Sequence, residues 1–506
     1  MNVLKRVISA MLCVVMLCGV LYVGAHQNAM KEQVLFEKND SVVLWYTDES
    51  MTDYLNAMAV AYQEEYGVRV LPFLQSGSDY LESMYEESVR GNSAPDLYIV
   101  SNEALEKAYL SGLAGEITDP QDLVNQNNFP QVALDAVSYD GKLVGYPYYF
   151  ETSALLYNKT YLYDMAKNLV EAQESMDELE ESQEAEGEDL EAASEASEDV
   201  NLSQDEKIEK RMQELIPTTF EQLLSLADEY DAPPAVEAVF KWDVTDIFYN
   251  YFFVGNYLNV GGPCGDDASQ IDIYNQEAID AMQVYQDLNQ FFSIEAEDVN
   301  YASVVQEFIE GKLVLTTATA DVIKKLETAA ENGEFTFEYG LTEIPDLNEE
   351  MQTKSMSVTN TVVVNNFSDQ LEEANAFATY LTCTNADSLY DKVGKIAAWE
   401  DAACKREDTA VFFREYAGSV PVPKLMVTSN FWIELEVAFA QVWRGEKVTN
   451  SLYELSELIM SQVTGEEYTE EYIEQEEEDT REYFDEEAER EAAKAETEMD
   501  SESEEE

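Results

Sequence analysis

A single carboxylate, Glu151, stands among aromatic residues in a segment where two short strands are expected to meet. The predicted strands cover residues 143–146 and 154–157, and the segment between them reads PYYFETS. Aromatic rings cover the apolar faces of a sugar, while a carboxylate accepts protons from its hydroxyl groups in charge-assisted hydrogen bonds. A strand that passes from one sheet directly into another forms a hinge between two lobes. We therefore expect Glu151 to face a ligand in the gap between those lobes.

Three further carboxylates follow predicted strands. Asp48, Glu103 and Asp321 come shortly after apolar runs that each read as a buried strand. In parallel α/β sheets, ligands bind beyond the carboxyl ends of the strands, so these side chains are candidates for the same site. Two carboxylates could also act as the acid and base of a glycosidase. Such pairs arise by chance, however, in a chain with 104 Asp and Glu residues.

The tryptophans divide into two groups by their sequence context. Trp45 lies within an apolar strand and Trp443 lies on the apolar stripe of a helix, so both are expected in the core. Trp242 and Trp432 lie near the starts of elements and have polar neighbours. Because ligand pockets combine aromatic surface with a few polar groups, we include Trp242 and Trp432 in the predicted binding site.

Several reaction classes are excluded by what the sequence lacks. The only histidine is His26, which excludes histidine-dependent nucleophilic catalysis and histidine-rich zinc sites within one chain. We find no phosphate-binding glycine loop, no dinucleotide fingerprint and no calcium-loop spacing of carboxylates. We therefore predict no catalytic residue, no metal ligand and no cofactor.

Strands alternate with helices over residues 42–111, which predicts a mostly parallel sheet with helices on both faces. Three later segments also read as strands, and several amphipathic or aromatic segments read as helices. The later strands are expected at 313–317, 335–341 and 361–364, and the helices at 247–257, 275–292, 304–311, 371–381, 431–443 and 451–463.

The negative charge is concentrated in two segments. Of the formal net charge of −75, residues 171–199 contribute 14 acidic and no basic residues, and residues 466–506 contribute 22 acidic and 3 basic residues. Neither segment can bury enough apolar surface to fold alone. We expect 171–199 to be a charged insertion, either mobile or a solvated helix, and 464–506 to be a disordered acidic tail. The remaining chain is also acidic, which disfavours binding to nucleic acid and anionic lipid.

The N-terminus has the features of an export signal. Lys5 and Arg6 precede an apolar run over 7–23, and small residues end the segment just before His26. We predict a signal peptide over residues 1–25 and a polar stem over 26–40. The apolar run is nearly as long as the ~20 residues that span a bilayer, so an uncleaved anchor is the alternative. Leucine precedes both cysteines of this run, so lipidation is not expected.

Outside the signal, the cysteines are Cys264, Cys383 and Cys404. Their spacing does not establish connectivity, so two alternatives remain. Either Cys383 and Cys404 form a bridge, or all three cysteines are buried free thiols.

A series of segments, in order and spacing, resembles the bacterial extracellular solute-binding proteins of the sugar-binding family, typified by maltodextrin-binding protein. The resemblance covers about residues 42–463, with 171–199 as an insertion. The segments are VVLWYTD at 42–48, APDLYI at 94–99, YDGKLVGYP at 139–147, LYNK at 156–159, FIEGK at 308–312 and NFW at 430–432.

The resemblance implies a type II periplasmic-binding-protein-like fold, in which two α/β lobes are joined by crossing strands and enclose a ligand cleft. It implies closure of the lobes on a carbohydrate and delivery to an ABC permease. The implied segments are 41–150 and 355–396 for lobe 1, and 151–345 and 400–463 for lobe 2. We expect hinge bending at the crossover, at a connector over 346–355 and near 396–400.

Residue by residue, the resemblance places Glu151 on the family's crossover carboxylate and Trp432 on a stacking tryptophan. It places Glu103 on a sugar-binding aspartate and Asp48 in a ligand-contacting first loop. Val100 and Ala104 depart from the stacking tryptophan and the arginine found there, so maltodextrin specificity is not implied.

The leading hypothesis is thus an exported or surface-anchored receptor, a monomer without enzymatic activity that supplies a carbohydrate to an ABC importer. Two alternatives are a surface-anchored sugar- or polyamine-sensing module without a transport role, and a glycosidase with paired carboxylates. The sequence leaves the identity of the ligand open.

Overall fold

The computed structural model describes residues 41–75, 79–91, 94–184, 202–292 and 294–474. The predicted signal or anchor, the polar stem, residues 185–199 of the acidic insertion and the tail after 474 lie outside these ranges. One compact unit ends at Tyr468, and the unit that begins at Thr469 is described only as far as residue 474. Within the described ranges, no helix is both long enough and apolar enough to cross a membrane.

The first sheet has seven strands in the order β14-β6-β13-β3-β1-β2, with β15 paired beside β13. The strands β1, β2 and β3 run parallel, whereas β13 is antiparallel to both β3 and β6. This sheet therefore combines the expected parallel strands with antiparallel strands from distant parts of the chain. The bounds are β1 (Ser41–Tyr46), β2 (Arg69–Leu74), β3 (Leu97–Ser101), β6 (Tyr146–Glu151), β13 (Met356–Val364), β14 (Ile396–Ala397) and β15 (Val420–Pro421).

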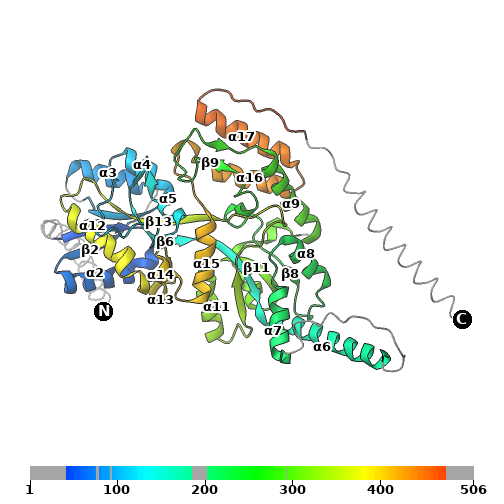
Figure 1. Ribbon diagram of the computed structural model, residues 1–506. Helices are drawn as coiled ribbons and strands as arrows, with labels where there is room; N and C mark the ends of the chain where they lie inside the picture. Colours follow the sequence, from blue (N-terminus) through cyan, green and yellow to red (C-terminus); the bar gives the residue numbers. More distant parts are fainter. Residues whose placement is uncertain (1–40, 76–78, 92–93, 185–201, 293, 475–506) are drawn as a thin grey trace, which may run out of the picture. The chain divides into compact units, whose positions relative to one another are not determined.

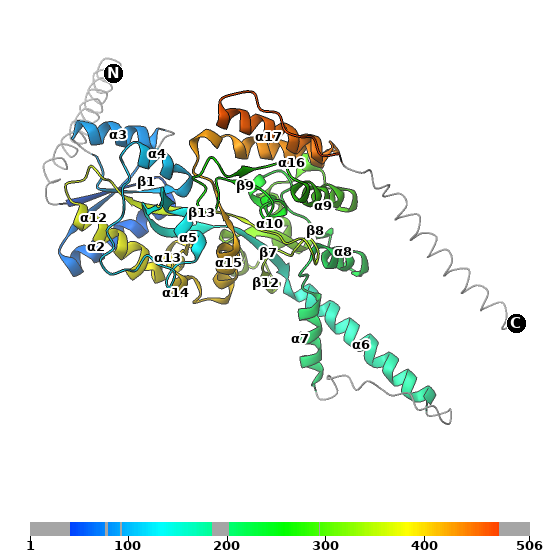
Figure 2. The ribbon, with the colours of Figure 1, turned by 45° about the horizontal axis from the view of Figure 1, so that its top comes forward.

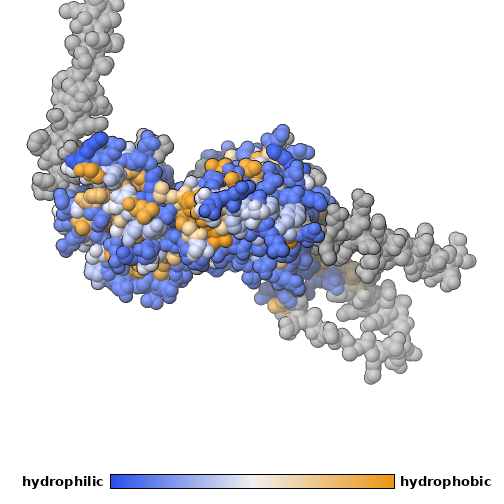
Figure 3. Space-filling view, turned by 90° about the horizontal axis from the view of Figure 1, so that it is seen from above, coloured by the Kyte–Doolittle hydropathy of each residue, from blue (hydrophilic) through white to orange (hydrophobic). Residues whose placement is uncertain are grey.

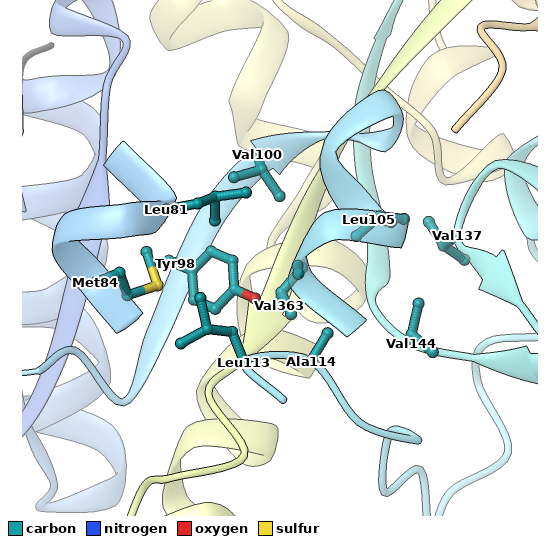
Figure 4. Packing of buried hydrophobic residues seen from close by; sticks show 11 residues of the cluster. Leu81, Met84, Tyr98, Val100, Leu105, Leu113, Ala114, Val137, Val144 and Val363 are labelled. Carbon is teal, nitrogen blue, oxygen red and sulfur yellow. The ribbon is translucent and has the colours of Figure 1, made fainter. Parts of the chain in front are cut away.

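Helices cover both faces of the first sheet (Figures 1 and 2), with α3 and α4 on one face and α2, α12 and α13 on the other. Figure 4 shows the core beneath α3 and α4, where Tyr98 and Val100 of β3 pack against Met84, Leu105 and Val363. Burying each such side chain contributes roughly 1.5–3 kcal/mol, so this core fixes the end of β3. The helices are α2 (Thr52–Tyr66), α3 (Tyr80–Arg90), α4 (Leu105–Leu110), α5 (Gln131–Ala136), α12 (Leu371–Thr379), α13 (Leu389–Val393) and α14 (Glu400–Ala403).

The second sheet has four strands in the order β12-β7-β11-β8. Strand β7 is antiparallel to both of its neighbours, and β11 is parallel to β8. The strands are β7 (Ser153–Asn158), β8 (Ala238–Phe240), β11 (Leu313–Thr319) and β12 (Tyr339–Thr342). Its helices are α6 (Lys159–Glu184), α7 (Gln204–Leu215), α8 (Phe220–Glu229), α9 (Gln276–Phe292), α10 (Tyr301–Ile309), α11 (Asp321–Glu331), α16 (Phe431–Trp443) and α17 (Val448–Thr464). A further helix, α15 (Glu407–Gly418), packs against α5 of the first lobe and against β7 and β12 of the second.

The two sheets are joined directly by β6 and β7, with only Thr152 between them. The aromatic segment that we expected to separate two short strands is itself the strand β6. Its residues Tyr146, Tyr148, Tyr149 and Phe150 are almost completely buried, because β6 lies between β13 and β14. The prediction of a direct crossover and of a strand over 154–157 is thus confirmed, whereas the predicted bounds 143–146 of the first strand were wrong.

Two helical expectations also need correction. Residues 247–257 do not form one helix but contain two short 3₁₀ turns, Ile247–Tyr249 and Tyr251–Phe253. The helix α7 was not expected, although Ser203 and Glu206 form a capping box at its start. Figure 2 shows α6 and α7 side by side. Helix α6 extends to Glu184, so residues 171–184 of the acidic insertion are helical. A helix was one of the two forms expected for this insertion.

Two small hairpins lie outside the main sheets, and the three cysteines of the described residues are unpaired. The pairs β4 (Ser138–Tyr139) with β5 (Lys142–Leu143) and β9 (Asn259–Val260) with β10 (Ile271–Asp272) form two-stranded hairpins. Cys264, Cys383 and Cys404 are free, so the bridge left open by the sequence is not formed. The face seen in Figure 3 is mainly hydrophilic, with hydrophobic residues in small groups.

A candidate ligand site at the strand crossover

Glu151 is the last residue of β6, immediately before the chain crosses to the second sheet. It pairs with Val358 of β13 in the first sheet, and its side chain is 45% exposed. The crossing itself is held in place because the Thr152 hydroxyl donates a buried hydrogen bond of 2.8 Å to the Met356 carbonyl oxygen. The carboxylate thus lies on a fixed backbone and retains contact with solvent.

A cavity of about 270 Å³ opens beside this crossover. Its lining includes Asp48, Ser101, Tyr149, Glu151 and Asn360, which come from four strands or strand ends of the first sheet. The structure therefore brings Asp48 and Glu151 to one cavity, together with the buried ring of Tyr149. A concave site with a few polar groups around apolar surface is the usual form of a small-molecule site.

Asp48 is oriented by the short turn that follows β1. Its Oδ1 accepts hydrogen bonds from the Ser50 backbone nitrogen at 2.9 Å and from the Ser50 hydroxyl at 2.6 Å. Burial tends to raise the pKa of Asp48, but these hydrogen bonds and the nearby charge of Lys395 outweigh it and lower the pKa. Asp48 is therefore an ionised acceptor at neutral pH.

A lysine that the sequence reasoning missed, Lys395, joins the two carboxylates. Its Nζ lies 3.0 Å from Glu151 Oε1 and 3.4 Å from Asp48 Oδ2, and 5.3 Å from the centre of the Tyr149 ring. Burial tends to lower the pKa of Lys395, but attraction to the two carboxylates raises it above its ordinary value. Lys395 therefore remains charged and neutralises part of the acidity around the cavity.

The antiparallel register explains why Lys395 meets Glu151. Strand β14 pairs Ile396 with Phe150 and Ala397 with Tyr149, so the preceding residue comes opposite Glu151. Opposite charges at facing positions of an antiparallel pair attract each other. The available signal was the position of Lys395 just before the third predicted crossing near 396–400.

Asp321 belongs to the second lobe, at the start of α11, just after β11. Its Oδ1 accepts a hydrogen bond of 2.8 Å from the Tyr301 hydroxyl, and its Oδ2 lies 2.6 Å from Lys325 Nζ. The end of β11 pairs with the start of β7, where Thr319 faces Ser153. Asp321 thus lies at the crossover end of the second sheet, and it is not a lining residue of the 270 Å³ cavity.

Glu103 and Trp432 lie outside the lining of the cavity. Glu103 is exposed after β3, and its carboxylate accepts a hydrogen bond of 3.2 Å from the hydroxyl of Ser101, a cavity residue. Trp432 lies half-buried in the first turn of α16 and packs edge-on against Tyr251, with ring centres 5.2 Å apart. Neither lines the cavity in this structure, so their contact with a ligand stays a prediction.

A family model for bacterial extracellular solute-binding proteins matches residues 57–396. The chain belongs to this family. A maltooligosaccharide ABC transporter solute-binding lipoprotein of Streptococcus pneumoniae is 22% identical over 76% of this chain and 80% of its own length. The maltodextrin-binding protein MdxE of Bacillus subtilis is 22% identical over 80% of this chain and 85% of its own.

Solved structures support the same fold for this solute-binding protein. An extracellular solute-binding protein of Staphylococcus aureus in complex with maltose superposes with a TM-score of 0.65 at 17% identity, and covers 84% of this chain and 98% of that chain. A maltotriose-binding protein of Thermus thermophilus superposes with a TM-score of 0.56 at 18% identity, and covers 84% of this chain and 100% of that chain. The two-lobe periplasmic-binding fold is therefore established.

Two further segments cross between the lobes of this solute-binding protein. The second passes from β12 to β13 through residues 343–355, and the third leaves β14 toward α15. The carboxylate of Glu415 on α15 holds the second crossing at both ends, because it accepts hydrogen bonds from the Ile344 backbone nitrogen and from the Ser355 hydroxyl, the latter at 2.9 Å. Helix α15 therefore contacts both ends of the second crossing.

Trp242 is not part of the site, which corrects the prediction from its local sequence. Its side chain is completely buried, stacks on Phe240 at 4.8 Å and meets Trp443 edge-on at 5.6 Å. Its indole nitrogen donates a hydrogen bond of 2.8 Å to Asn250 Oδ1. The adjacent Lys241 pairs with Glu307 instead, and Asn250 satisfies the indole within the core of the second lobe.

The arrangement combines groups that suit the binding of a ligand. Among the described residues, no group of three or more His, Cys, Asp or Glu side chains could hold a metal ion. The cavity offers two carboxylates, Asp48 and Glu151, and an aromatic ring, and the Lys395 ammonium lies beside both carboxylates.

Proposed function

We propose that this protein captures a carbohydrate between its two lobes and supplies it to an ABC permease. The observation that carries the proposal is the grouping of Asp48, Glu151 and Lys395 around the Tyr149 ring at the crossover. Carboxylates and ammonium groups bind sugar hydroxyls, and an aromatic ring covers an apolar sugar face. The maltooligosaccharide and maltodextrin names of the relatives support the same ligand class.

We further propose that residues 41–150 and 355–396 move against residues 151–345 and 400–463 as two lobes. A ligand held by both lobes prefers the closed form and shifts the population toward it. In that form Asp321, Glu103 and Trp432 would complete the cleft around a ligand that first meets Asp48 and Glu151. The three crossings would bend while the lobes remain rigid.

A ligand screen tests this function. Thermal unfolding and titration calorimetry should be measured with maltose, longer maltodextrins, other neutral oligosaccharides, monosaccharides and spermidine. A ligand that binds only the folded state raises the melting temperature, and we expect this from at least one sugar with one site per chain. The sugar should be recovered chemically unchanged. Its hydrolysis would establish a glycosidase, and binding of spermidine alone would contradict the carbohydrate proposal.

Glu151 provides the residue-level test. Replacing Glu151 with alanine should weaken sugar binding by on the order of 1.5–3 kcal/mol, because a charge-assisted hydrogen bond is lost. Glu116→Ala is the matched control, since Glu116 is an exposed carboxylate of the same lobe and does not line the cavity. Equal affinities of the Glu151 variant and the unchanged protein would remove Glu151 from the site.

A further inference from the structure

Each lobe presents a carboxylate, a lysine and a tyrosine ring grouped near the crossover. In the first lobe Lys395 joins Glu151 and Asp48 above the Tyr149 ring. In the second lobe Lys325 lies 2.6 Å from Asp321 and 4.6 Å from the centre of the Tyr301 ring. In both groups a lysine therefore forms an ion pair with the carboxylate in the absence of a ligand.

The hydrogen-bonding capacity of such a pair matches one chemical group best. A carboxylate only accepts hydrogen bonds and an ammonium only donates them, whereas a hydroxyl does both. A hydroxyl beside the Lys395–Glu151 pair can donate to the carboxylate while it accepts from the lysine. A ligand carboxylate would be repelled by Asp48 and Glu151. A ligand ammonium would be repelled by Lys395, which already occupies the positions beside the two carboxylates where the ammonium would bind.

We propose that Lys395 is a specificity-determining residue that selects an uncharged polyhydroxyl ligand and excludes cationic ligands from this acidic protein. The inference rests on the proposed carbohydrate function and adds the charge class of the sugar. It also names the residue that sets this charge class.

The position of Lys395 gives its charge this influence. The Lys395 side chain is only 26% exposed, so solvent screens its charge less than that of a surface lysine. The chain carries a formal net charge of −75, and a strongly negative protein otherwise concentrates cations at its surface. Pairing of β14 with β6 holds Lys395 opposite Glu151, so its ammonium lies against two carboxylates that line the cavity.

Three variants test the proposal in the full-length protein. Lys395→Met removes the charge and keeps a flexible side chain, and Lys395→Arg keeps the charge. Lys392→Met is the matched control, because Lys392 is an exposed lysine of α13 three residues earlier. Binding is measured by calorimetry with neutral oligosaccharides, glucosamine oligomers, galacturonate oligomers and spermidine, after thermal unfolding has shown that each variant is folded.

We expect the unchanged protein, the Lys392 variant and the Lys395→Arg variant to bind a neutral sugar and to exclude glucosamine oligomers and spermidine. The Lys395→Met variant should bind the neutral sugar about tenfold to hundredfold more weakly, as expected for loss of one charged hydrogen bond. It should also bind spermidine or glucosamine oligomers more tightly than the unchanged protein does.

Three outcomes would overturn the proposal. If the Lys395→Met variant bound the neutral sugar as tightly as the unchanged protein and still excluded cations, Lys395 would not set specificity. If the unchanged protein bound only a charged sugar, this inference would fail while the carbohydrate function stood. Binding of spermidine with no sugar bound would reject both.

Discussion

Replacing Glu415 with glutamine should stabilise the ligand-free protein at alkaline pH and leave its stability at acidic pH nearly unchanged. The carboxyl group of Glu415 is half-buried between α15 and the second crossing. Burial raises its pKa from 4.5 to about 7, although the hydrogen bonds from Ile344 and Ser355 oppose this rise. Glutamine resembles the protonated carboxyl in size and in its neutral charge.

The magnitude follows from the difference between the folded and unfolded pKa values. At roughly 1.4 kcal/mol for each pKa step, the shift from 4.5 to about 7 corresponds to about 3 kcal/mol. The side chain keeps some contact with solvent, so we expect about 2 kcal/mol. Because the pKa of Glu415 is higher in the folded protein, its protonated carboxyl contributes fully to the stability of the unchanged protein below pH 4.5. This contribution is lost as pH rises through about 7, and the glutamine variant avoids that loss.

Urea unfolding of both proteins between about pH 5 and pH 8.5 measures this effect as a difference. Other titrating groups act equally in both proteins and cancel in that difference. Glu454→Gln is the control, because Glu454 is an exposed carboxylate within α17. A constant stability difference across the pH range, or the same profile for the control, would refute the assignment of a raised pKa to Glu415.

Three further predictions concern the core, the connector and the lobes. Trp242→Ala should cost about 3–5 kcal/mol of unfolding free energy while the folded protein keeps its sugar affinity, and a selective loss of affinity would return Trp242 to the site. Gly255→Ala should cost about 3 kcal/mol in urea unfolding, because its Cβ would lie 2.0 Å from the Lys354 carbonyl oxygen. Gly418→Ala is the control, since its Cβ would meet no atom within 4 Å, and equal stabilities would contradict the packing argument. Small-angle scattering should show a smaller radius of gyration with saturating ligand, whereas identical profiles would count against hinge closure.

Local sequence was sufficient to expect two carboxylates of the candidate site at the ends of strands. Asp48 comes directly after the apolar run of β1, and Glu151 ends the aromatic strand β6. Strand direction and the carboxyl-end rule then place them at the same edge of one sheet. The family resemblance added the order of the segments, and with it the two-lobe fold.

Tryptophan placement shows where local reasoning failed. Trp242 and Trp432 both stand near the start of an element with polar neighbours, and their sequence contexts look alike. Burial separates them, because Trp242 meets Phe240 and the distant Trp443 while Trp432 stays half-buried on α16. The partners that fill the space around an indole come from elsewhere in the chain, so its exposure is a property of the assembled lobe.

Lys395 shows the same limit within the site. Its one local signal is its position just before the third predicted crossing, and its partner Glu151 is 244 residues earlier in the chain. The chain itself determined that carboxylates would end certain strands, because the apolar and aromatic runs specify those strands locally. Only the tertiary structure decided that β14 pairs with β6 and brings a lysine between two of those carboxylates, because strand register is set by contacts between distant segments.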